Sequence, residues 1–424
     1  MRFNCNVNFS AVIKISLALI LPLTSMMANS VVANANFYQC KSNIKERAIK
    51  LGFSAFITDD IIEGISVITR IVELDKRQPE FTQTFEQYIK ARVTDYHVET
   101  GMRKLTEHKE LFDRLTKEYA VPRQYLVSFW GLETFFGKNK GKMSVLNSLA
   151  TLACDQRRSK FFTQELFNLF TLLDSKKVTK AQLQGSWAGA MGHMQFMPSA
   201  FMQYAVDGDN DGIVDIWQSE IDALTTAANY LHQIGWQQKE HWGREVRLPE
   251  DFDFRQVVFD KYYPLSHFKQ LGVKKIANSQ LSDDKIDTEL FLPAGHQGPA
   301  FLLYPNFNVI MTWNLSKSYA LSVGILANKL MGLEGVKAFS KDNKSTVYSV
   351  NEMKGLQNKL ILVGLYTGKP DGIWGPKSRN AIRSFQLKHK LVPDGFPNKE
   401  VFDTINQLDI SLKNAEIKPR QSSE

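Results

Sequence analysis

The sequence predicts a mainly α-helical protein with a large N-terminal domain and a small C-terminal one. Apolar residues recur at helical spacing through much of the first 335 residues, which is typical of amphipathic helices. A stretch rich in Pro, Gly and β-prone runs interrupts this pattern at 241–310, and a polar stretch at 336–347 precedes a compact second unit. With 424 residues, of which 43% are hydrophobic, the chain can build more than one core.

Residues 1–35 have the three parts of a secretory signal peptide. Arg2 and Lys14 supply basic charge, residues 15–23 form a short apolar run, and Ala33-Asn34-Ala35 is a small-residue cleavage site. The apolar run is too short to span a bilayer comfortably, and no second segment is long and apolar enough to do so. We therefore expect export and cleavage after Ala35, with an uncleaved N-terminal anchor as the alternative.

Two of the three cysteines remain after such cleavage, because Cys5 leaves with the signal peptide. In an oxidising compartment Cys40 and Cys154 either pair as a disulfide or stay as two buried thiols, and the sequence favours neither. No Cys/His spacing fits a zinc site. Cys40 does not follow a lipoprotein cleavage motif, so no lipid anchor is expected.

The chain is basic, with a net charge of +8 and a pI of about 9.1. Such a balance suits nucleic acid, an anionic membrane surface or an anionic polymer. No helix-turn-helix or aromatic-basic RNA motif is present, so nucleic acid is not an expected partner. Together with an export signal, the charge favours a cell-envelope polymer, whereas a solvated basic face is the alternative for scattered lysines such as Lys138, Lys140 and Lys142.

The large domain, residues 36–335, is expected to contain several helices and one small insertion of strands and loops at 241–310. Pro79 and Gly101 break the first helical patterns, and Pro122 fits the start of a helix that Gly137 would end. The expected helices lie within 44–74, 111–136, 161–173, 220–234 and 318–332.

The small C-terminal unit, residues 348–410, has amphipathic segments joined by turns at Asp371-Gly372 and Asp394-Gly395. The polar stretch 336–347 is predicted to be a linker, and the polar residues 411–424 are predicted to form a flexible tail.

Glu133 is the first candidate for chemistry, because it is a lone carboxylate in the apolar segment 129–137. Burial disfavours the charged form of a carboxyl group and raises its pKa, so that the group can act as a general acid near neutral pH. The alternative places Glu133 on the solvated face of an amphipathic helix.

A second dense segment, residues 185–199, is rich in Gly and Ala and contains Ser186, His193 and Gln195. Its glycines permit close backbone approach, either to a ligand or to a neighbouring helix. Ser186 and Gln195 offer hydrogen bonds suited to a polar substrate. For His193 a structural hydrogen bond is the more common role, and we do not expect it to be a catalytic base.

Three segments together resemble the membrane-bound lytic murein transglycosylase B family. They are Gly131-Leu132-Glu133-Thr134 with Gly137, the segment 185–199, and Val309-Ile310-Met311-Thr312-Trp313-Asn314 with Ser316 and Tyr319-Ala320-Leu321. The resemblance covers about 36–335 and implies a lysozyme-like helical catalytic domain that acts on peptidoglycan glycan strands in the periplasm. Cell-wall synthesis or division proteins are further partners that such a role implies.

The resemblance assigns roles to residues of this chain. Glu133 matches the family's catalytic acid/base, and Trp313 stands where many members have Tyr. Trp313 keeps a face for stacking on a sugar but lacks the phenolic hydroxyl. Ser186 is expected to hydrogen-bond Glu133. The implied substrate-pocket residues are Ser186, Gln195, Tyr230, Asn314 and Tyr319.

The resemblance implies cleavage of the MurNAc-β-1,4-GlcNAc bond without water, which needs one carboxyl group and no cofactor. A hydrolytic glycosidase normally uses two carboxylates, and none lies near Glu133 in the sequence. The nearest, Asp155, is expected to form a structural ion pair with Arg157-Arg158. A hydrolytic muramidase and a non-catalytic wall-binding scaffold are the alternatives.

A calcium loop is predicted at 207–215, where Asp207, Asp209 and Asp211 alternate before Gly212. The carboxylate usual at loop position 12 is absent, and the resemblance points to Asp222 instead. The ion would be structural, and an acidic surface turn is the alternative.

The C-terminal unit resembles the small three-helix peptidoglycan-binding domain. The residues that carry this resemblance are mostly core and turn positions, so that they indicate the fold better than binding. They include Leu356-Gln357, Asp371-Gly372-Ile373-Trp374-Gly375, Phe385-Gln386 and Pro393-Asp394-Gly395.

Overall fold

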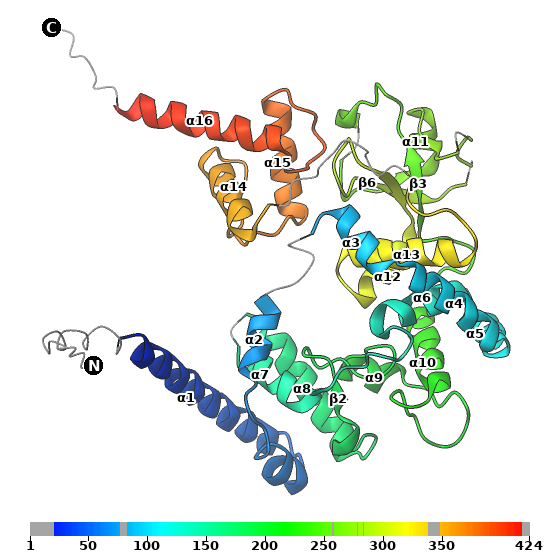
Figure 1. Cartoon of the computed structure of the whole chain (residues 1–424), viewed down its shortest axis with the longest axis vertical. Coiled ribbons are helices and arrows are strands. Elements are labelled where there is room, and N and C mark those ends of the chain that lie inside the picture. The colour runs from blue at the N-terminus through cyan, green and yellow to red at the C-terminus, as the bar shows by residue number, and fades with distance from the viewer. Residues whose placement is uncertain are drawn as a thin grey trace, which may run out of the picture. The chain divides into compact units, whose positions relative to one another are not determined.

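The computed structural model describes residues 21–76, 83–155, 157–256, 258–277, 279–282, 284–337 and 348–417. The predicted mainly α-helical fold is confirmed, and strands are confined to two short pieces and one small sheet (Figure 1). Within these ranges no helix is both long and apolar enough to cross a membrane. The first 20 residues, most of the linker 336–347 and residues 418–424 lie outside the description.

The chain divides into two units, and the first combines the residues up to Val72 with Leu146–Val178. Cys40 and Cys154 form a disulfide in it, which decides between the two predicted states of these cysteines. Phe53 packs its ring against those of Phe167 and Phe170. The elements of this unit are α1 (Leu21–Lys50), η1 (Phe56–Ile61), the first part of α2 (Thr69–Lys76), most of α7 (Val145–Ala153) and α8 (Ser159–Asp174). Helix α1 runs through the predicted cleavage site.

The second unit, Glu73–Val145 with Thr179–Glu424, contains the helices that carry Glu133. Helix α6 (Arg123–Thr134) is buried along Tyr125–Gly131 and packs against α4 (Asp95–Glu107) and α13 (Lys317–Leu330). Helices α5 (Lys109–Tyr119) and α10 (Glu220–Gln233) also pack against α6, α3 (Phe85–Arg92) and α12 (Pro305–Trp313) pack against α13, and α9 (Pro198–Tyr204) packs against α10. The short 3₁₀ turn Lys180–Gln182 and the pair β1 (Met143–Ser144) and β2 (Gln184–Gly185) complete this part.

The ends of α6 follow local rules, with one correction to the sequence prediction. Pro122 is the N-cap residue, as the fixed φ of proline favours at a helix start. The helix ends at Thr134 rather than at Gly137, because Phe135 and Phe136 already have left-handed φ values of 52° and 57°. Gly137 continues this conformation at φ 83°, and a Cβ there would come within 2.3 Å of the His193 ring. Glu133 is therefore the penultimate residue of the helix.

The predicted insertion is a five-stranded antiparallel sheet in the order β4-β6-β7-β3-β5. Its central strand, Ala300–Leu303, is buried throughout, as expected for an apolar run. Leu265 and Phe268 from the short helix α11 (Leu265–Gln270) contribute to the core over the sheet. The strands are β3 (Gly243–Arg247), β4 (Tyr263–Pro264), β5 (Lys274–Lys275), β6 (Asp287–Phe291) and β7 (Ala300–Leu303).

The C-terminal unit is a three-helix bundle of α14 (Val350–Leu362), α15 (Pro376–Lys388) and α16 (Lys399–Ile417), drawn orange to red in Figure 1. Leu356, Phe385 and Ile405 lie in its small core. Helix α16 continues to Ile417, beyond the predicted boundary at residue 410.

The observed division differs from the predicted domains in two ways. The predicted domain 36–335 is split between the two units, and the C-terminal bundle groups with the second of them. Long-range contacts cause both differences, because the 40–154 disulfide ties together segments 114 residues apart and α15 bonds to the insertion.

Candidate active site

Glu133 lies where α6 and α13 pack together, and two side chains donate to one of its oxygens. The indole N–H of Trp313 donates to Oε1 at 3.0 Å, and the phenolic O–H of Tyr319 donates to the same atom. These donors lie 180 and 186 residues further along the chain. Oε2 receives no hydrogen bond from the described residues, so that a proton on the carboxyl group belongs on Oε2.

Burial raises the pKa of Glu133 to about 7. The hydrogen bonds from Tyr319 and Trp313, and the more distant charge of Arg92, oppose this shift because they favour the carboxylate. The residue nevertheless keeps partial exposure to solvent, so that a substrate can reach it. Such a group is protonated in about half of the molecules at neutral pH, as a general acid that also acts as a base requires.

Trp313 hydrogen-bonds the candidate acid although it lacks a phenolic hydroxyl. Its indole N–H takes the place of that group and donates to Glu133. The ring packs against Phe129, Phe196 and Tyr230 with centroid distances of 4.5, 5.4 and 5.2 Å. Trp313 therefore both orients the carboxyl group and belongs to an aromatic cluster beside it.

The glycine-rich segment is a loop and not a pair of packed helices. Isolated bridges join Gly185 to Met191 and Met191 to Phe196, so that the chain folds back on itself twice. The hydroxyl of Thr134 donates to the carbonyl of His193 at 2.7 Å. This bond fixes the loop to the last turn of α6, next to Glu133.

Ser186 and Gln195 both lie in this loop, but neither bonds Glu133. Ser186 Oγ accepts the N–H groups of Ala188 and Ala190 at 3.3 and 3.0 Å, which corrects the expected bond to Glu133. Gln195 Nε2 donates to the carbonyls of Lys140 and Gly192 at 3.2 and 2.9 Å. With its amide nitrogen held, Gln195 has its Oε1 to offer to a donor on a ligand.

His193 has the structural role that the sequence favoured. Its ring is buried, and Nδ1 accepts the indole N–H of Trp130 at 3.2 Å. Burial, together with the charges of Lys140 and Lys104, lowers the pKa of His193 to about 4. The imidazole is therefore neutral at physiological pH, and its hydrogen bond with Trp130 connects the loop to α6.

Tyr230 and Asn314 complete the set of predicted pocket residues. Tyr230 joins the aromatic cluster through Trp313 and Phe196, and its hydroxyl donates to the carbonyl of Thr312 at 3.5 Å. Asn314 is exposed after the end of α12, where its Oδ1 accepts the N–H of Ser316 at 3.2 Å. Tyr230 thus lies in the cluster around Glu133, whereas Asn314 lies at its edge.

Arg92 and Phe129 are site residues that sequence reasoning missed. The guanidinium of Arg92 lies 5.0 Å from the ring centroid of Tyr88, and its charge lowers the pKa of Glu133. Phe129 supports the Trp313 ring from α6. No motif marks Arg92, because it comes from α3, about 40 positions before Glu133 in the sequence. Phe129 lies in the apolar segment 129–137, where its pattern is that of any buried helix residue and does not indicate a place in the site.

The predicted calcium loop brings three of its four acids together. One carboxylate oxygen from each of Asp207, Asp209 and Asp211 lies within 4.8 Å of the others. Asp222 is instead buried, and its two oxygens accept the N–H groups of Gly208 and Asp215 at 2.8 and 2.7 Å. It holds the two ends of the loop rather than joining the cluster. Hard oxygen ligands at this spacing fit a calcium ion.

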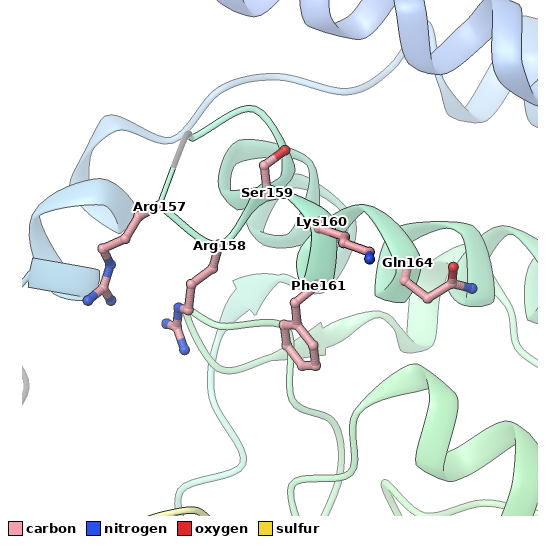
Figure 2. A pocket seen from close by; sticks show the side chains of 6 residues that line it. All are labelled: Arg157, Arg158, Ser159, Lys160, Phe161 and Gln164. Carbon is pink, nitrogen blue, oxygen red and sulfur yellow. The ribbon is translucent and has the colours of Figure 1, made fainter. Parts of the chain in front are cut away.

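A basic pocket of about 560 Å³ lies at the start of α8 in the first unit (Figure 2). Asp155, the nearest candidate in the sequence for a second catalytic carboxylate, accepts the backbone N–H of Arg157 at 3.0 Å. This bond gives Asp155 a structural role in the turn before α8. The pocket contributes to the positive balance of the chain. Its lining residues are Arg157, Arg158, Ser159, Lys160, Phe161 and Gln164.

Comparisons with known proteins agree with these observations. The family model described as Transglycosylase SLT domain matches residues 36–328, and a putative peptidoglycan binding domain matches 349–405. The membrane-bound lytic murein transglycosylase B of Escherichia coli K12 is 30% identical over 243 residues, which are 56% of this chain. The match spans 64% of that relative's length.

Solved structures extend the similarity over most of the chain. SltB3 from Pseudomonas aeruginosa, in complex with NAG-anhNAM-pentapeptide, has a TM-score of 0.81 at 35% identity, over 87% of this chain and 99% of its own. The Escherichia coli Slt35 in complex with calcium has a TM-score of 0.58 at 27% identity, over 70% of this chain and 92% of its own. The chain therefore belongs to the transglycosylase family defined by the SLT domain, and it carries a C-terminal unit of the peptidoglycan-binding type.

Proposed function

We propose that this protein is a lytic murein transglycosylase with Glu133 as its single general acid/base. The observation that carries the proposal is the buried carboxyl group whose pKa is raised to about 7 and whose Oε1 alone receives two hydrogen bonds. One buried acid suffices for this reaction, whereas a hydrolytic glycosidase normally uses a pair of carboxyl groups on the two sides of the bond.

The reaction runs in two proton transfers. Oε2 of Glu133 gives its proton to the glycosidic oxygen between MurNAc and GlcNAc, and the bond from that oxygen to C1 of MurNAc breaks. The substrate's own N-acetyl group stabilises the developing positive charge at C1. The Glu133 carboxylate then takes the proton of the MurNAc C6 hydroxyl as its oxygen bonds C1. A 1,6-anhydro end forms, no water is consumed and the acid is restored.

Product analysis distinguishes this reaction from its alternatives. The chain from residue 36 onward, incubated with purified peptidoglycan, is expected to release fragments ending in 1,6-anhydro-MurNAc, each lighter by one water than a reducing end. Mass spectrometry that found reducing ends instead would identify a muramidase, and an unchanged polymer would leave only a wall-binding scaffold.

The location follows from the same assignment. A wall enzyme of this family needs access to peptidoglycan, and the basic, apolar and small-residue parts of 1–35 fit a secretory signal. We propose export to the periplasm with cleavage after Ala35, and attachment to the wall through the C-terminal bundle.

A calcium ion is part of the proposal, held by Asp207, Asp209 and Asp211. Slt35 crystallised in complex with calcium is similar to this chain, and the three carboxylates converge here. Bound ion would offset their mutual repulsion and stabilise the loop. Calcium at 100 times its Kd is expected to stabilise the fold by about 2.7 kcal/mol.

Thermal unfolding with calcium and with a chelator measures this effect. The unfolding midpoint is expected to rise with calcium in the parent protein and to rise much less in Asp209→Ala, which loses one oxygen ligand. If the unfolding midpoint of the parent did not change with calcium, the proposed calcium site would be excluded.

A further inference from the structure

The C-terminal bundle contains the same turn twice, and the two copies differ in what they contact. In the first copy, Gln357 of α14 donates to Asp371 Oδ1 at 2.8 Å and accepts the N–H of Gly372 at 2.8 Å. Asp371 Oδ1 also accepts the N–H of Ile373 at 2.8 Å. A buried glutamine thus holds the aspartate of a tight turn through Oδ1, the inner carboxylate oxygen. Oδ2 is the outer oxygen.

The second copy repeats this network 29 positions later on the helix. Gln386 of α15 donates to Asp394 Oδ1 at 2.7 Å and accepts the N–H of Gly395 at 2.8 Å. Asp394 Oδ1 also accepts the N–H of Phe396 at 2.9 Å. Val350 and Arg379, again 29 positions apart, place their carbonyl oxygens 2.5 and 3.0 Å from a Cβ built on Gly372 and on Gly395. The two turns are therefore equivalent in three dimensions.

The outer oxygen of the second turn is occupied by another part of the chain. Asp394 is 1% exposed, and its Oδ2 contacts both the backbone N–H of His296 at 2.9 Å and the ring Nδ1 of that residue at 2.6 Å. His296 lies between β6 and β7 of the insertion. The second turn thus already binds a peptide residue that presents two adjacent nitrogen donors.

Two arginines of α15 extend the contact between the second turn and the insertion. Arg383 donates to the carbonyl of Phe254 at 3.1 Å. The buried guanidinium of Arg379 lies 4.9 and 4.8 Å from the ring centroids of Phe259 and Phe291, over which it can stack. His296, Phe254 and Phe259, which these side chains contact, all belong to the insertion, so that this turn serves the protein's own assembly.

The first turn presents the same acceptor to solvent. Asp371 is exposed, and no described residue hydrogen-bonds its Oδ2. Ile373 beside it is 37% exposed and offers an apolar contact. We propose that the Asp371 turn is the wall-binding element of this domain, and that Asp371 Oδ2 takes a peptide N–H with an adjoining nitrogen donor, as Asp394 takes His296.

The chemical class of the ligand follows from the occupied copy. The second turn binds an amino-acid residue through two nitrogen donors, not a sugar through hydroxyl groups. The stem peptides of peptidoglycan offer runs of amide N–H groups and free amino groups, so we assign the first turn to the stem peptide. This assignment rests on the proposed attachment of the bundle to the wall.

The duplicated turn supplies matched variants for the test. Asp371→Asn and Asp394→Asn each keep an acceptor at Oδ1 for the glutamine and replace the outer oxygen by an NH₂ donor. Both are made in full-length protein carrying Glu133→Gln, so that the wall is not degraded. Binding is measured by co-sedimentation with purified sacculi and with glycan strands stripped of peptides by an amidase. Circular dichroism checks that each variant unfolds at the parent's midpoint.

Asp371→Asn is expected to bind intact sacculi about tenfold more weakly than its parent, since a hydrogen bond to a charged group is lost. Its binding to stripped glycan should equal the parent's. Asp394→Asn should bind sacculi at least as well as the parent, while small-angle scattering shows a larger radius of gyration because docking is weakened.

Three results would overturn the inference. Equal binding of Asp371→Asn and its parent to sacculi would remove the turn from wall recognition. An equal loss on sacculi and on stripped glycan would make the ligand a sugar. If the Glu133→Gln parent itself failed to sediment, the proposed wall attachment would fail first, and that result is visible without the turn variants.

Discussion

Replacing Glu133 by Gln is expected to lower kcat on peptidoglycan by about 100- to 10,000-fold, the usual contribution of a general acid/base. The amide has nearly the shape of the carboxyl group and can still accept the hydrogen bonds of Trp313 and Tyr319 at its oxygen. The NH₂ group that replaces Oε2 cannot give or take the catalytic proton. The release of soluble fragments from labelled sacculi measures the change.

The matched control is Glu99→Gln, because Glu99 is exposed on α4 and undergoes the same chemical change away from the acid. It should keep the parent's rate, and neither variant should unfold below the parent's temperature. A Glu133→Gln protein that retained the parent's rate would take Glu133 out of the mechanism.

The rate is also expected to fall by about tenfold for each pH unit above pH 7, since only the protonated acid starts the reaction. The sign follows from the cause of the shift. Burial raises the pKa of Glu133 from the ordinary carboxyl range to about 7, so that the protonated form persists to neutral pH and is lost as the pH rises further. The alkaline limb of kcat against pH should therefore have its midpoint near pH 7.

Tyr319→Phe tests whether this limb belongs to Glu133. The tyrosine O–H favours the carboxylate and lowers the pKa of Glu133, so its loss should move the limb upward by about one pH unit. Trp313→Phe removes the indole N–H and should move the limb in the same direction. A limb that stayed in place in both variants would have to arise from another group.

Local features of the fold could be predicted because their causes lie within a few residues. Pro122 begins α6 as its fixed φ allows, and the two Asp-Gly pairs form turns. The end of α6 could not be placed, since Phe135 takes a left-handed conformation that its own sequence disfavours. The ring of Phe136 packs over Gly131 there, so that tertiary packing decides the end.

Features that join distant segments stayed open or were assigned differently. The sequence could not choose between a disulfide and two thiols for Cys40 and Cys154, because pairing depends on which segments meet in space. The family resemblance assigns Asp222 to the metal, whereas the buried side chain accepts backbone N–H groups at both ends of the loop. It also implies a bond from Ser186 to Glu133, but Ser186 bonds its own loop.

The sequence by itself determined the family, through three separated segments, and with it the candidate acid Glu133. The lone carboxylate in an apolar segment acquires its raised pKa only because the fold buries it. Only the tertiary structure decided how the acid is held: α13 and the end of α12 bring two donors onto the same oxygen of Glu133. Hydrogen-bond direction depends on distances of a few ångströms between chain segments, and no local pattern encodes them.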